Sequence, residues 1–339
     1  MSARRNIIPV FVPHLGCPND CVFCNQRRIS GSLAPATAES VVSAIREGIR
    51  RIPPGEDVEL AFYGGSFTAI PAREQEKLLG SALPFLRDGA IKTVRLSTRP
   101  DAIDEETLRR LASFGVTTIE LGAQSMSDRV LELSGRGHTS ADTVRAAEMI
   151  KNAGFNLILQ MMTGLPGDDN ETALETARKI AALRPDGVRI YPTVIIRDTD
   201  LFDMWKRGEY AEHTVEDAVR LCARILPVFR AAGIPVIRLG LNPTDELSGG
   251  SVAGGAYHPA FGELVRSYMM LNEARKLLRD VPRGSHAVLG VHKSRVSAMV
   301  GQKRANIDTL MAEFGLKSLK VRVADVEMDS IKLLSVAID

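Results

Sequence analysis

Three of the four cysteines lie within eight residues, in the segment Cys17-Pro-Asn-Asp-Cys21-Val-Phe-Cys24. Three thiolates on one short loop can hold three irons of a [4Fe–4S] cluster and leave the fourth iron without a protein ligand. Such an open iron can bind and reduce an exogenous molecule, which a fully ligated electron-transfer cluster cannot do. The spacing therefore predicts a reactive iron–sulfur site.

Two other uses of these cysteines fit less well. Structural zinc takes four ligands, usually as two separated pairs, and His14 precedes the cysteines without a pairing pattern. A redox Cys-x-x-Cys pair would leave Cys17 unexplained. The fourth cysteine, Cys222, lies beside Leu221 and Ile225 on a predicted helix, where core packing is expected. Zinc stays the alternative if no cluster assembles.

The elements that must position this loop follow one repeated theme. Residues 108–115 form a helical, amphipathic stretch that ends in Gly115, and the strand-like run 116–121 follows at once. Residues 144–154 end in Gly154 and lead into residues 155–160 in the same way. Glycine ends such helices without Cβ strain. Further units are expected at 7–12 with 38–50, 58–62, 91–96, 181–191 and 231–239.

Strands that alternate with helices predict a parallel sheet covered by crossover helices. Six or seven successive units without a dinucleotide fingerprint favour a (β/α) barrel over a doubly wound sheet. In barrels the chemistry lies on the loops after the strands. Unusual residues fall on five such loops, at 64–66, 97–101, 122–124, 163–167 and 191–192. We therefore expect one site built from many loops.

Composition sets outer limits on function. The 339 residues carry 43 lysines and arginines against 41 acids, so no global field attracts nucleic acid or membrane. No apolar run reaches the roughly 18 residues of a membrane span. The apolar run near the start of the chain is too short, and too interrupted by proline, to be a signal peptide. We expect a cytoplasmic, soluble protein without a membrane partner, in which cysteines serve as ligands or catalysts.

The cysteine spacing after a first strand resembles the radical S-adenosylmethionine (radical SAM) enzymes. The resemblance implies a partial (β/α)6-type TIM barrel that holds a [4Fe–4S] cluster on Cys17, Cys21 and Cys24. In that superfamily the open iron chelates the methionine part of SAM. An electron from the cluster then yields a 5′-deoxyadenosyl radical, which abstracts a substrate hydrogen. The protein positions and shields this chemistry.

The same resemblance implies SAM contacts from six residues: Gly64, Gly65, Ser66, Ser97, Gln124 and Arg136. The glycine pair lets the backbone approach the methionine ammonium, and Arg136 suits the carboxylate as a charged donor. Gln124 and Arg136 have the spacing of the SAM-binding pair in relatives of oxygen-independent coproporphyrinogen oxidase. The turn 164–167 resembles the loop that lines the adenine. The pattern assigns no catalytic residue.

Several strings are similar to the radical domain of the Elongator catalytic subunit, which modifies the wobble uridine of transfer RNA using acetyl-CoA. They lie at 65–68, 97–101, 119–125, 136–139 and 190–205. That family has a longer gap between its first two cysteines and a C-terminal acetyltransferase domain, which does not fit the remaining residues. The resemblance is therefore to short, stand-alone bacterial forms. It implies an RNA substrate, with transfer RNA favoured, and a reducing partner such as flavodoxin or ferredoxin.

The expected division is a radical SAM partial barrel at 1–240, a linker and helix at 241–280, and a small α/β C-terminal domain at 281–339. Residues 291–307 carry four cations and no acid. Within them Gly301-Gln-Lys-Arg304 resembles a degenerate KH motif, in which a Gly-x-x-Gly loop clamps a nucleic-acid backbone. Arg304 replaces the last glycine. The alternative is a small cap with a solvated basic helix.

Two other functions stay open at this point. One is radical chemistry on a small molecule such as a tetrapyrrole, which would need a pocket lined by arginines and no basic tail. The other is a non-catalytic iron–sulfur protein that binds RNA through cations of the tail and does not turn over SAM. The cations concerned are Lys293, Arg295, Lys303 and Arg304.

Overall fold

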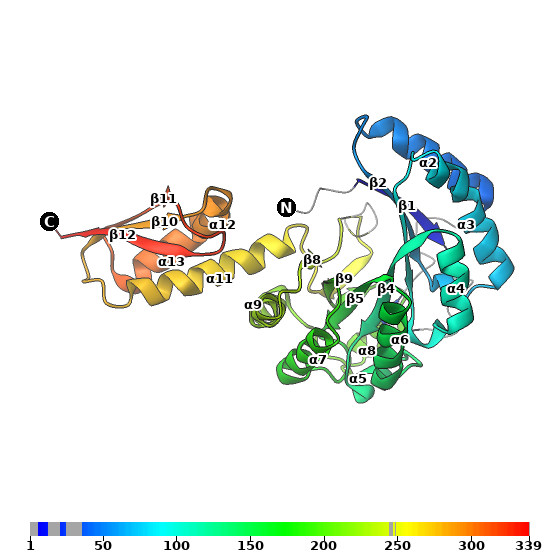
Figure 1. Cartoon of the computed structure of the whole chain (residues 1–339). Helices are drawn as coiled ribbons and strands as arrows, with labels where there is room; N and C mark the ends of the chain where they lie inside the picture. Colours follow the sequence, from blue (N-terminus) through cyan, green and yellow to red (C-terminus); the bar gives the residue numbers. More distant parts are fainter. Residues whose placement is uncertain (1–5, 13–20, 25–35, 244–246, 248, 339) are drawn as a thin grey trace. The chain divides into compact units, whose positions relative to one another are not determined.

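The computed structural model describes residues 6–12, 21–24, 36–243, 247 and 249–338 (Figure 1). The chain forms two compact units. Unit 1 comprises Met1–Thr214 and Ile225–Tyr257, and unit 2 comprises Val215–Arg224 and His258–Asp339. His14 and Cys17 lie outside the described residues. No helix in the described part of the chain is long and apolar enough to cross a membrane.

Unit 1 is built on a seven-stranded sheet with the order β1-β2-β3-β4-β5-β6-β8. All neighbouring strands are parallel. The strands are β1 (Asn6–Val12), β2 (Val58–Gly64), β3 (Thr93–Thr98), β4 (Val116–Gln124), β5 (Asn156–Thr163), β6 (Gly187–Pro192) and β8 (Val236–Leu239). Sequential order and parallel pairing confirm the expected partial (β/α) barrel.

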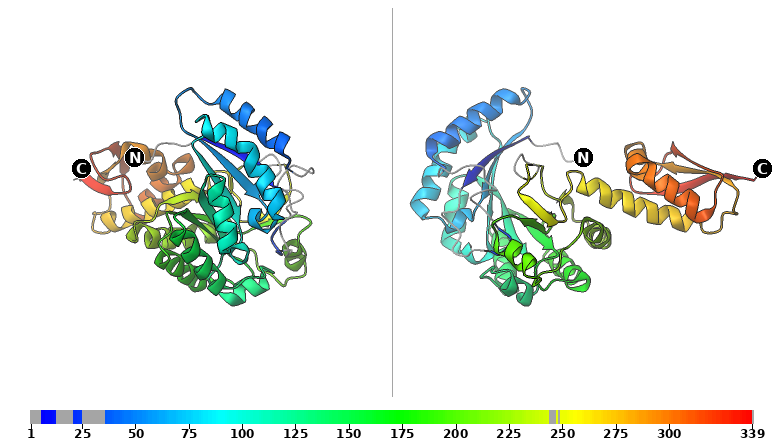
Figure 2. Two further views of the ribbon diagram at one scale, coloured as in Figure 1. Left: turned by 45° about the vertical axis from the view of Figure 1, so that its right-hand side comes forward. Right: turned by 180° about the vertical axis from the view of Figure 1, so that it is seen from behind.

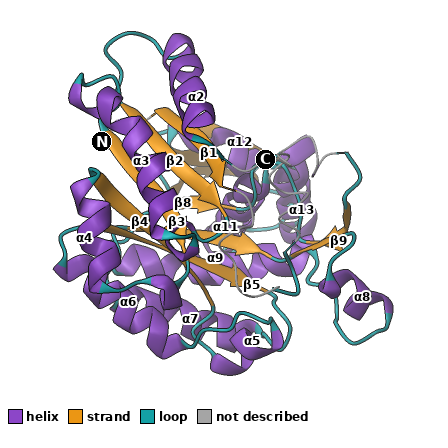
Figure 3. Ribbon diagram, turned by 90° about the vertical axis from the view of Figure 1, so that its right-hand side faces the viewer, coloured by secondary structure: helices purple, strands orange, loops and turns teal. Residues whose placement is uncertain are grey.

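Helices connect the strands and lie along the sheet, as Figure 3 shows for α3, α4 and α6 beside β2, β3 and β4. The helices between β1 and β8 are α2 (Ala38–Arg51), α3 (Ala72–Arg87), α4 (Glu105–Ser113), α5 (Asp128–Leu133), α6 (Ser140–Asn152), α7 (Asn170–Ala182), α8 (Asp200–Lys206) and α9 (Val215–Ala231), with the single turns η1 (Phe67–Ala69) and η2 (Pro100–Ala102). The first part of α9, Val215–Arg224, belongs to unit 2. Asp104, Thr139 and Asp169 cap the N-termini of α4, α6 and α7. These caps fix where each loop ends and its helix begins.

The two faces of this sheet differ in chemistry. Leu60, Leu96 and Ile119 are fully buried and belong to the apolar face that the helices cover. Because side chains alternate along a strand, Glu59 and Glu120, each next to one of these residues, lie on the opposite, concave face. The helices therefore pack on an ordinary apolar core, whereas the concave face is polar.

A second, antiparallel pair of strands completes unit 1. β7 (Val194–Ile196) pairs with β9 (Val252–Gly255), and the amide of Ala256 donates to the carbonyl of Thr193 at 2.9 Å. Part of the Gly-rich segment after residue 241 therefore forms a strand within unit 1.

Unit 2 contains a three-stranded sheet with the order β11-β10-β12, in which β10 is parallel to β11 and antiparallel to β12 (Figure 2). Its elements are α11 (Phe261–Leu278), β10 (His286–Val291), η3 (Lys293–Arg295), α12 (Val296–Val300), η4 (Gln302–Arg304), α13 (Ala305–Phe314), β11 (Ser318–Val323) and β12 (Ile331–Ala337). Ala274, Leu289 and Leu310 are fully buried in its core. Unit 2 thus has a hydrophobic core of its own.

Candidate active site

The segment Cys21–Cys24 is held from two distant parts of unit 1. The amide of Cys24 donates to the carbonyl of Cys21 at 2.9 Å, which closes a tight turn. Between them, Val22 donates to the carbonyl of Ser134 at 3.1 Å and accepts from the amide of Leu201 at 2.8 Å. Val22 and Phe23 also pack against the buried cluster of Ile195, Leu201 and Tyr210. Backbone bonds and packing therefore fix the direction of this short turn.

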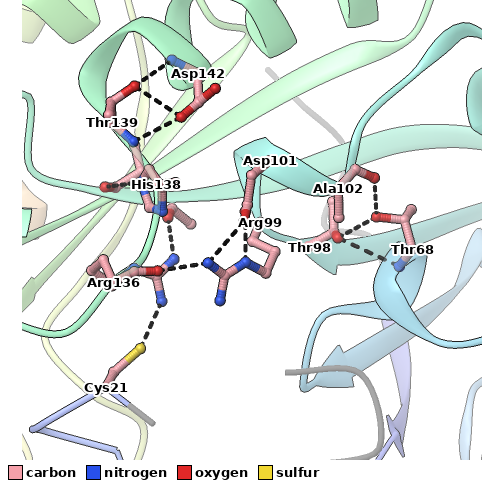
Figure 4. Close-up of polar contacts among 12 residues, drawn as sticks. Cys21, Thr68, Thr98, Arg99, Asp101, Ala102, Arg136, His138, Thr139 and Asp142 are labelled. Carbon is pink, nitrogen blue, oxygen red and sulfur yellow. Dashed lines mark hydrogen bonds and ion pairs between the residues drawn. The ribbon is translucent and has the colours of Figure 1, made fainter. Parts of the chain in front are cut away.

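Arg136 connects the cysteine segment to the end of β4. Its Nη1 donates to Sγ of Cys21 at 3.3 Å, and its Nη2 donates to the carbonyl of Gly122 at 2.7 Å (Figure 4). Arg136 is only 8% exposed. A planar guanidinium that donates in two directions sets the spacing between the groups it contacts. Arg136, predicted from the sequence as a charged donor, is therefore a buried arginine in contact with Cys21, one of the three predicted cluster ligands.

Neighbouring loops hold Arg136 in place. Arg99 donates to the backbone carbonyl of Arg136 at 2.6 Å and forms a two-point ion pair with Asp101 (Figure 4). His138 contacts the carbonyl of Ala123 at 3.3 Å. Burial, with the nearby charge of Arg136, lowers the pKa of His138 to about 4. At neutral pH this imidazole is uncharged and can donate one N–H to that carbonyl.

Gln124 has a backbone conformation that is rare for a side-chain-bearing residue. Its φ is +63°, at a register shift in the pairing of β4 with β5. Its Oε1 accepts from Nε2 of Gln160 at 3.3 Å, and it is 5% exposed. A left-handed conformation costs a side-chain-bearing residue of order 1 kcal/mol or more, and such strained residues cluster at functional sites. The bulge turns Gln124 away from the regular strand direction.

The loop after β2 is tied to the end of β1. Gly64 has a φ of +103°, and a Cβ there would come within 2.6 Å of the carbonyl oxygen of Val12. The amide of Gly65 donates to the same carbonyl at 3.0 Å, and the adjacent Ser66 is buried. Glycine is therefore required at position 64 both for its φ and for this close approach.

The loops after β2 and β3 are also joined to each other. The hydroxyls of Thr68 and Thr98 are 2.6 Å apart, and the Thr68 hydroxyl donates to the carbonyl of Ala102 at 2.6 Å (Figure 4). Ser97, immediately before Thr98 on β3, is half-buried. It lies on the strand face of Arg95, because the two residues are two positions apart.

The structure thus brings some predicted site residues into contact and only places others nearby. Cys21, Gly122 and Arg136 are linked directly, with Gln124 on the same strand end. The glycine pair and Ser97 end the neighbouring strands β2 and β3. Cys17 is outside the described residues, and within the described residues no three His, Cys, Asp or Glu side chains group as a metal site.

A row of buried and half-buried charges on the concave face was not predicted from the sequence. Arg95 pairs with both Glu59 and Glu120, with 2.8 Å to the latter, and Arg189 pairs with Glu120 at 2.9 Å. Arg189 also donates to the phenol of Tyr63 at 3.2 Å. Burial raises the pKa of Tyr63 to about 12, so this phenol keeps its proton. Charged residues inside four parallel strands were the available signal, since such strands are otherwise apolar.

The turn after β5 depends on another buried acid. Oδ2 of Asp168 accepts from the amide of Gly164 at 2.9 Å, and the phenol of Tyr210 donates to the Gly164 carbonyl at 2.5 Å. Both polar groups of Gly164 are therefore held. Burial raises the pKa of Asp168 to about 7 from 3.8, although hydrogen bonds from the Gly164 and Asp169 amides oppose this.

This shift predicts a pH-dependent stability. Since the folded chain holds the Asp168 proton to higher pH than the unfolded chain does, the free energy of unfolding should fall as pH rises from 3.8 through about 7. Asp168→Asn keeps an acceptor for Gly164 without the charge. We expect it to stabilise the protein at pH 8 by on the order of 2 kcal/mol, measured by urea unfolding at pH 5 and pH 8.

The matched control is Asp169→Asn, the same chemical change at the next residue. Hydrogen bonds from Thr172 lower the pKa of Asp169, so the charged form of this carboxylate stabilises the fold. Removing its charge should therefore not raise the free energy of unfolding at pH 8. Parallel pH profiles for Asp168→Asn and the parent chain would contradict the assignment.

Comparison with known proteins identifies the family. A family model described as the radical SAM superfamily matches residues 11–180, and one for a radical SAM C-terminal domain matches residues 185–270. The chain belongs to the radical SAM superfamily. It is therefore a radical SAM enzyme by family, and its partial barrel is the fold of that family.

Curated relatives support the Elongator-like branch, and a solved structure shares the fold. The chain is 30% identical over 188 residues to the tRNA uridine(34) acetyltransferase of Methanocaldococcus jannaschii, covering 50% of this chain and 35% of that protein. It is 30% identical over 191 residues to Elongator complex protein 3 of Mus musculus, with the same coverage. The match thus spans about a third of these relatives. The archaeal Elp3 of Methanocaldococcus infernus, with its N-terminus deleted, superimposes with a TM-score of 0.63 at 23% identity, covering 79% of this chain and 63% of that one.

Proposed function

We propose that this radical SAM enzyme holds a [4Fe–4S] cluster on Cys17, Cys21 and Cys24 and uses it to cleave SAM for the modification of an RNA, with transfer RNA as the favoured substrate. The observation that carries the proposal is the position of Arg136, which donates to Cys21 and to the end of β4 from a buried site.

The residues present fit the two cofactors. Thiolates are the usual protein ligands of iron–sulfur clusters, and Cys21 lies 9% exposed beside a guanidinium that can donate to a cluster thiolate. Gly64 leaves no room for a side chain beside β1, so the backbone itself borders this loop. When bound, the cluster supplies the electron that cleaves the SAM sulfonium and so generates a carbon radical able to abstract hydrogen.

The chain's own residues would bind and orient SAM. Arg136 suits the methionine carboxylate, and the loop of Gly64, Gly65 and Ser66 suits the methionine ammonium through backbone contacts. Ser97 and Gln124 would take the polar groups of the nucleoside. The turn at Gly164, held on both sides by Asp168 and Tyr210, would present a fixed backbone to the adenine.

The choice of RNA rests on the relatives and on the concave face. The archaeal relative is named a tRNA uridine(34) acetyltransferase, although the match covers only about a third of it. Arg95 and Arg189 are each paired with glutamates in the described residues, so these two arginines offer no spare charge for the carboxylates of a tetrapyrrole. A small reducing protein such as flavodoxin or ferredoxin would supply the electron.

The test is anaerobic assembly with iron and sulfide, followed by reduction with dithionite in the presence of SAM. We expect 5′-deoxyadenosine by chromatography and a [4Fe–4S]⁺ electron paramagnetic resonance signal that SAM perturbs. With transfer RNA added, a new nucleoside should appear by mass spectrometry only when SAM is present. A cluster that ignores SAM would replace the proposal with a structural or sensory role, and the absence of a cluster would favour zinc.

Arg136→Lys is the informative variant of this experiment. Lysine keeps the charge but cannot donate toward Cys21 and Gly122 from one planar group. We expect an unchanged iron content and a rate of 5′-deoxyadenosine formation about ten- to a hundredfold lower at limiting SAM. An unchanged rate would remove Arg136 from the SAM site.

A further inference from the structure

The connection between α12 and α13 in unit 2 presents two cations on an unusual backbone. Gly301, Lys303 and Arg304 have φ values of +76°, +50° and +68°. Lys303 and Arg304 are exposed, and in the described part of the chain neither forms an ion pair. Left-handed conformations cost a lysine or arginine roughly 1 kcal/mol each, whereas glycine adopts them freely. The loop therefore holds cationic side chains where the backbone alone would favour glycine.

A buried side chain fixes this loop to the rest of unit 2. Asn306, 7% exposed, directs its amide nitrogen at the carbonyl and hydroxyl oxygens of Ser267 and at the carbonyl of Ala298, at 3.0 to 3.2 Å. Its backbone also lies against Gly301, where a Cβ would come within 3.0 Å. The loop that carries the two cations is thus hydrogen-bonded to the rest of unit 2.

The neighbouring strand carries further cations. Both α12 and α13 pack against β11, which is an edge strand of the sheet and parallel to β10. Lys320 and Arg322 on β11 are exposed and, in the residues described, unpaired with any acid. None of the three strands of this sheet contains an acidic residue. Lys320 and Arg322 alternate with Leu319 and Val321, which belong to the core of unit 2, so the two cations lie on the face of β11 that points away from that core.

We propose that unit 2 binds the sugar–phosphate backbone of single-stranded RNA through two sets of exposed cations, Lys303 and Arg304 of the loop 301–304 and Lys320 and Arg322 of the edge strand β11. The charge pattern and the helix–loop–helix between parallel strands fit a phosphate backbone. Aromatic residues for base stacking are absent from the loop and from β11, so binding is electrostatic and tolerant of sequence. This surface goes beyond the proposed function, because it needs neither cluster nor SAM. Only the choice of RNA rests on that function.

The test is fluorescence anisotropy of the full-length chain with a labelled single-stranded RNA of mixed sequence, across a series of salt concentrations. Two variants carry the prediction: Lys303→Glu with Arg304→Glu, and Lys320→Glu with Arg322→Glu. Each removes about two phosphate contacts, so affinity should fall about tenfold or more. The slope of log affinity against log salt should shrink by about 1.4. Lys92→Glu with Lys276→Glu changes the net charge equally at exposed sites elsewhere and should bind as the parent chain does.

Arg304→Gly separates binding from folding. Glycine relieves the left-handed backbone, so the melting temperature should stay the same or rise while RNA affinity falls. Equal losses in the control variant, or unchanged binding in both paired variants, would overturn the proposal. SAM cleavage without RNA should be unaffected in all of them. A failure of RNA binding is therefore distinguishable from a failure of radical chemistry.

Discussion

Replacing Cys21 by alanine should abolish SAM cleavage and leave the fold intact. The variant retains at most two of the three proposed ligands, so iron content after anaerobic assembly and 5′-deoxyadenosine formation should both fall to background. Stability should change little, because the turn at residues 21–24 keeps its backbone bonds to Ser134 and Leu201. The measurements are iron per chain, product by chromatography and the thermal unfolding midpoint.

Cys222→Ala is the matched control, since it removes the same atom from a different place. Cys222 on α9 is fully buried, so its truncation should cost about 1 kcal/mol of stability and leave iron content and SAM cleavage unchanged. The two variants should therefore show opposite patterns. SAM cleavage by the Cys21→Ala protein would show that the ligand assignment is wrong.

Glu120→Ala should produce the largest loss of stability. Glu120 is 3% exposed and contacts both Arg95 and Arg189. Its removal leaves Arg95 with Glu59 but leaves Arg189, whose side chain is only 13% exposed, without a carboxylate partner. Breaking a buried ion pair on one side costs about 3–5 kcal/mol, which for a unit of this size lowers Tm by about 10 °C. Urea and thermal unfolding would measure the loss.

Two further variants test the cause of that loss. Glu148→Ala removes an exposed glutamate from α6 and should change stability by less than about 0.5 kcal/mol. Glu120→Leu combined with Arg189→Met removes both members of the pair and should recover part of the loss, because no unpaired charge stays buried. A single Glu120→Ala variant as stable as the parent would mean that water reaches this row of charges.

The fold could be predicted from the sequence because its signals are local. Helices such as residues 105–113 end near a glycine, and each strand that follows is apolar on the face that packs against helices. The cysteine spacing and the strings after each strand likewise carry their information in short segments. Family membership followed from these same strings.

Contacts between distant segments were not predictable in this way. Nothing near Arg136 in the sequence shows that its guanidinium reaches Cys21, or that Arg99 holds its carbonyl. The bulge that turns Gln124 depends on pairing with β5, since its neighbours along the chain look like an ordinary strand. The charged row was visible as single residues, but its pairing exists only once β2, β3, β4 and β6 lie together.

The two backbone bonds at Val22 also set an order for the maturation of the protein. The turn near the start of the chain is completed by the carbonyl of Ser134 and the amide of Leu201. A ribosome must therefore release most of unit 1 before this turn can take its final form. In the proposed function, iron and sulfide would consequently enter a barrel that is already assembled.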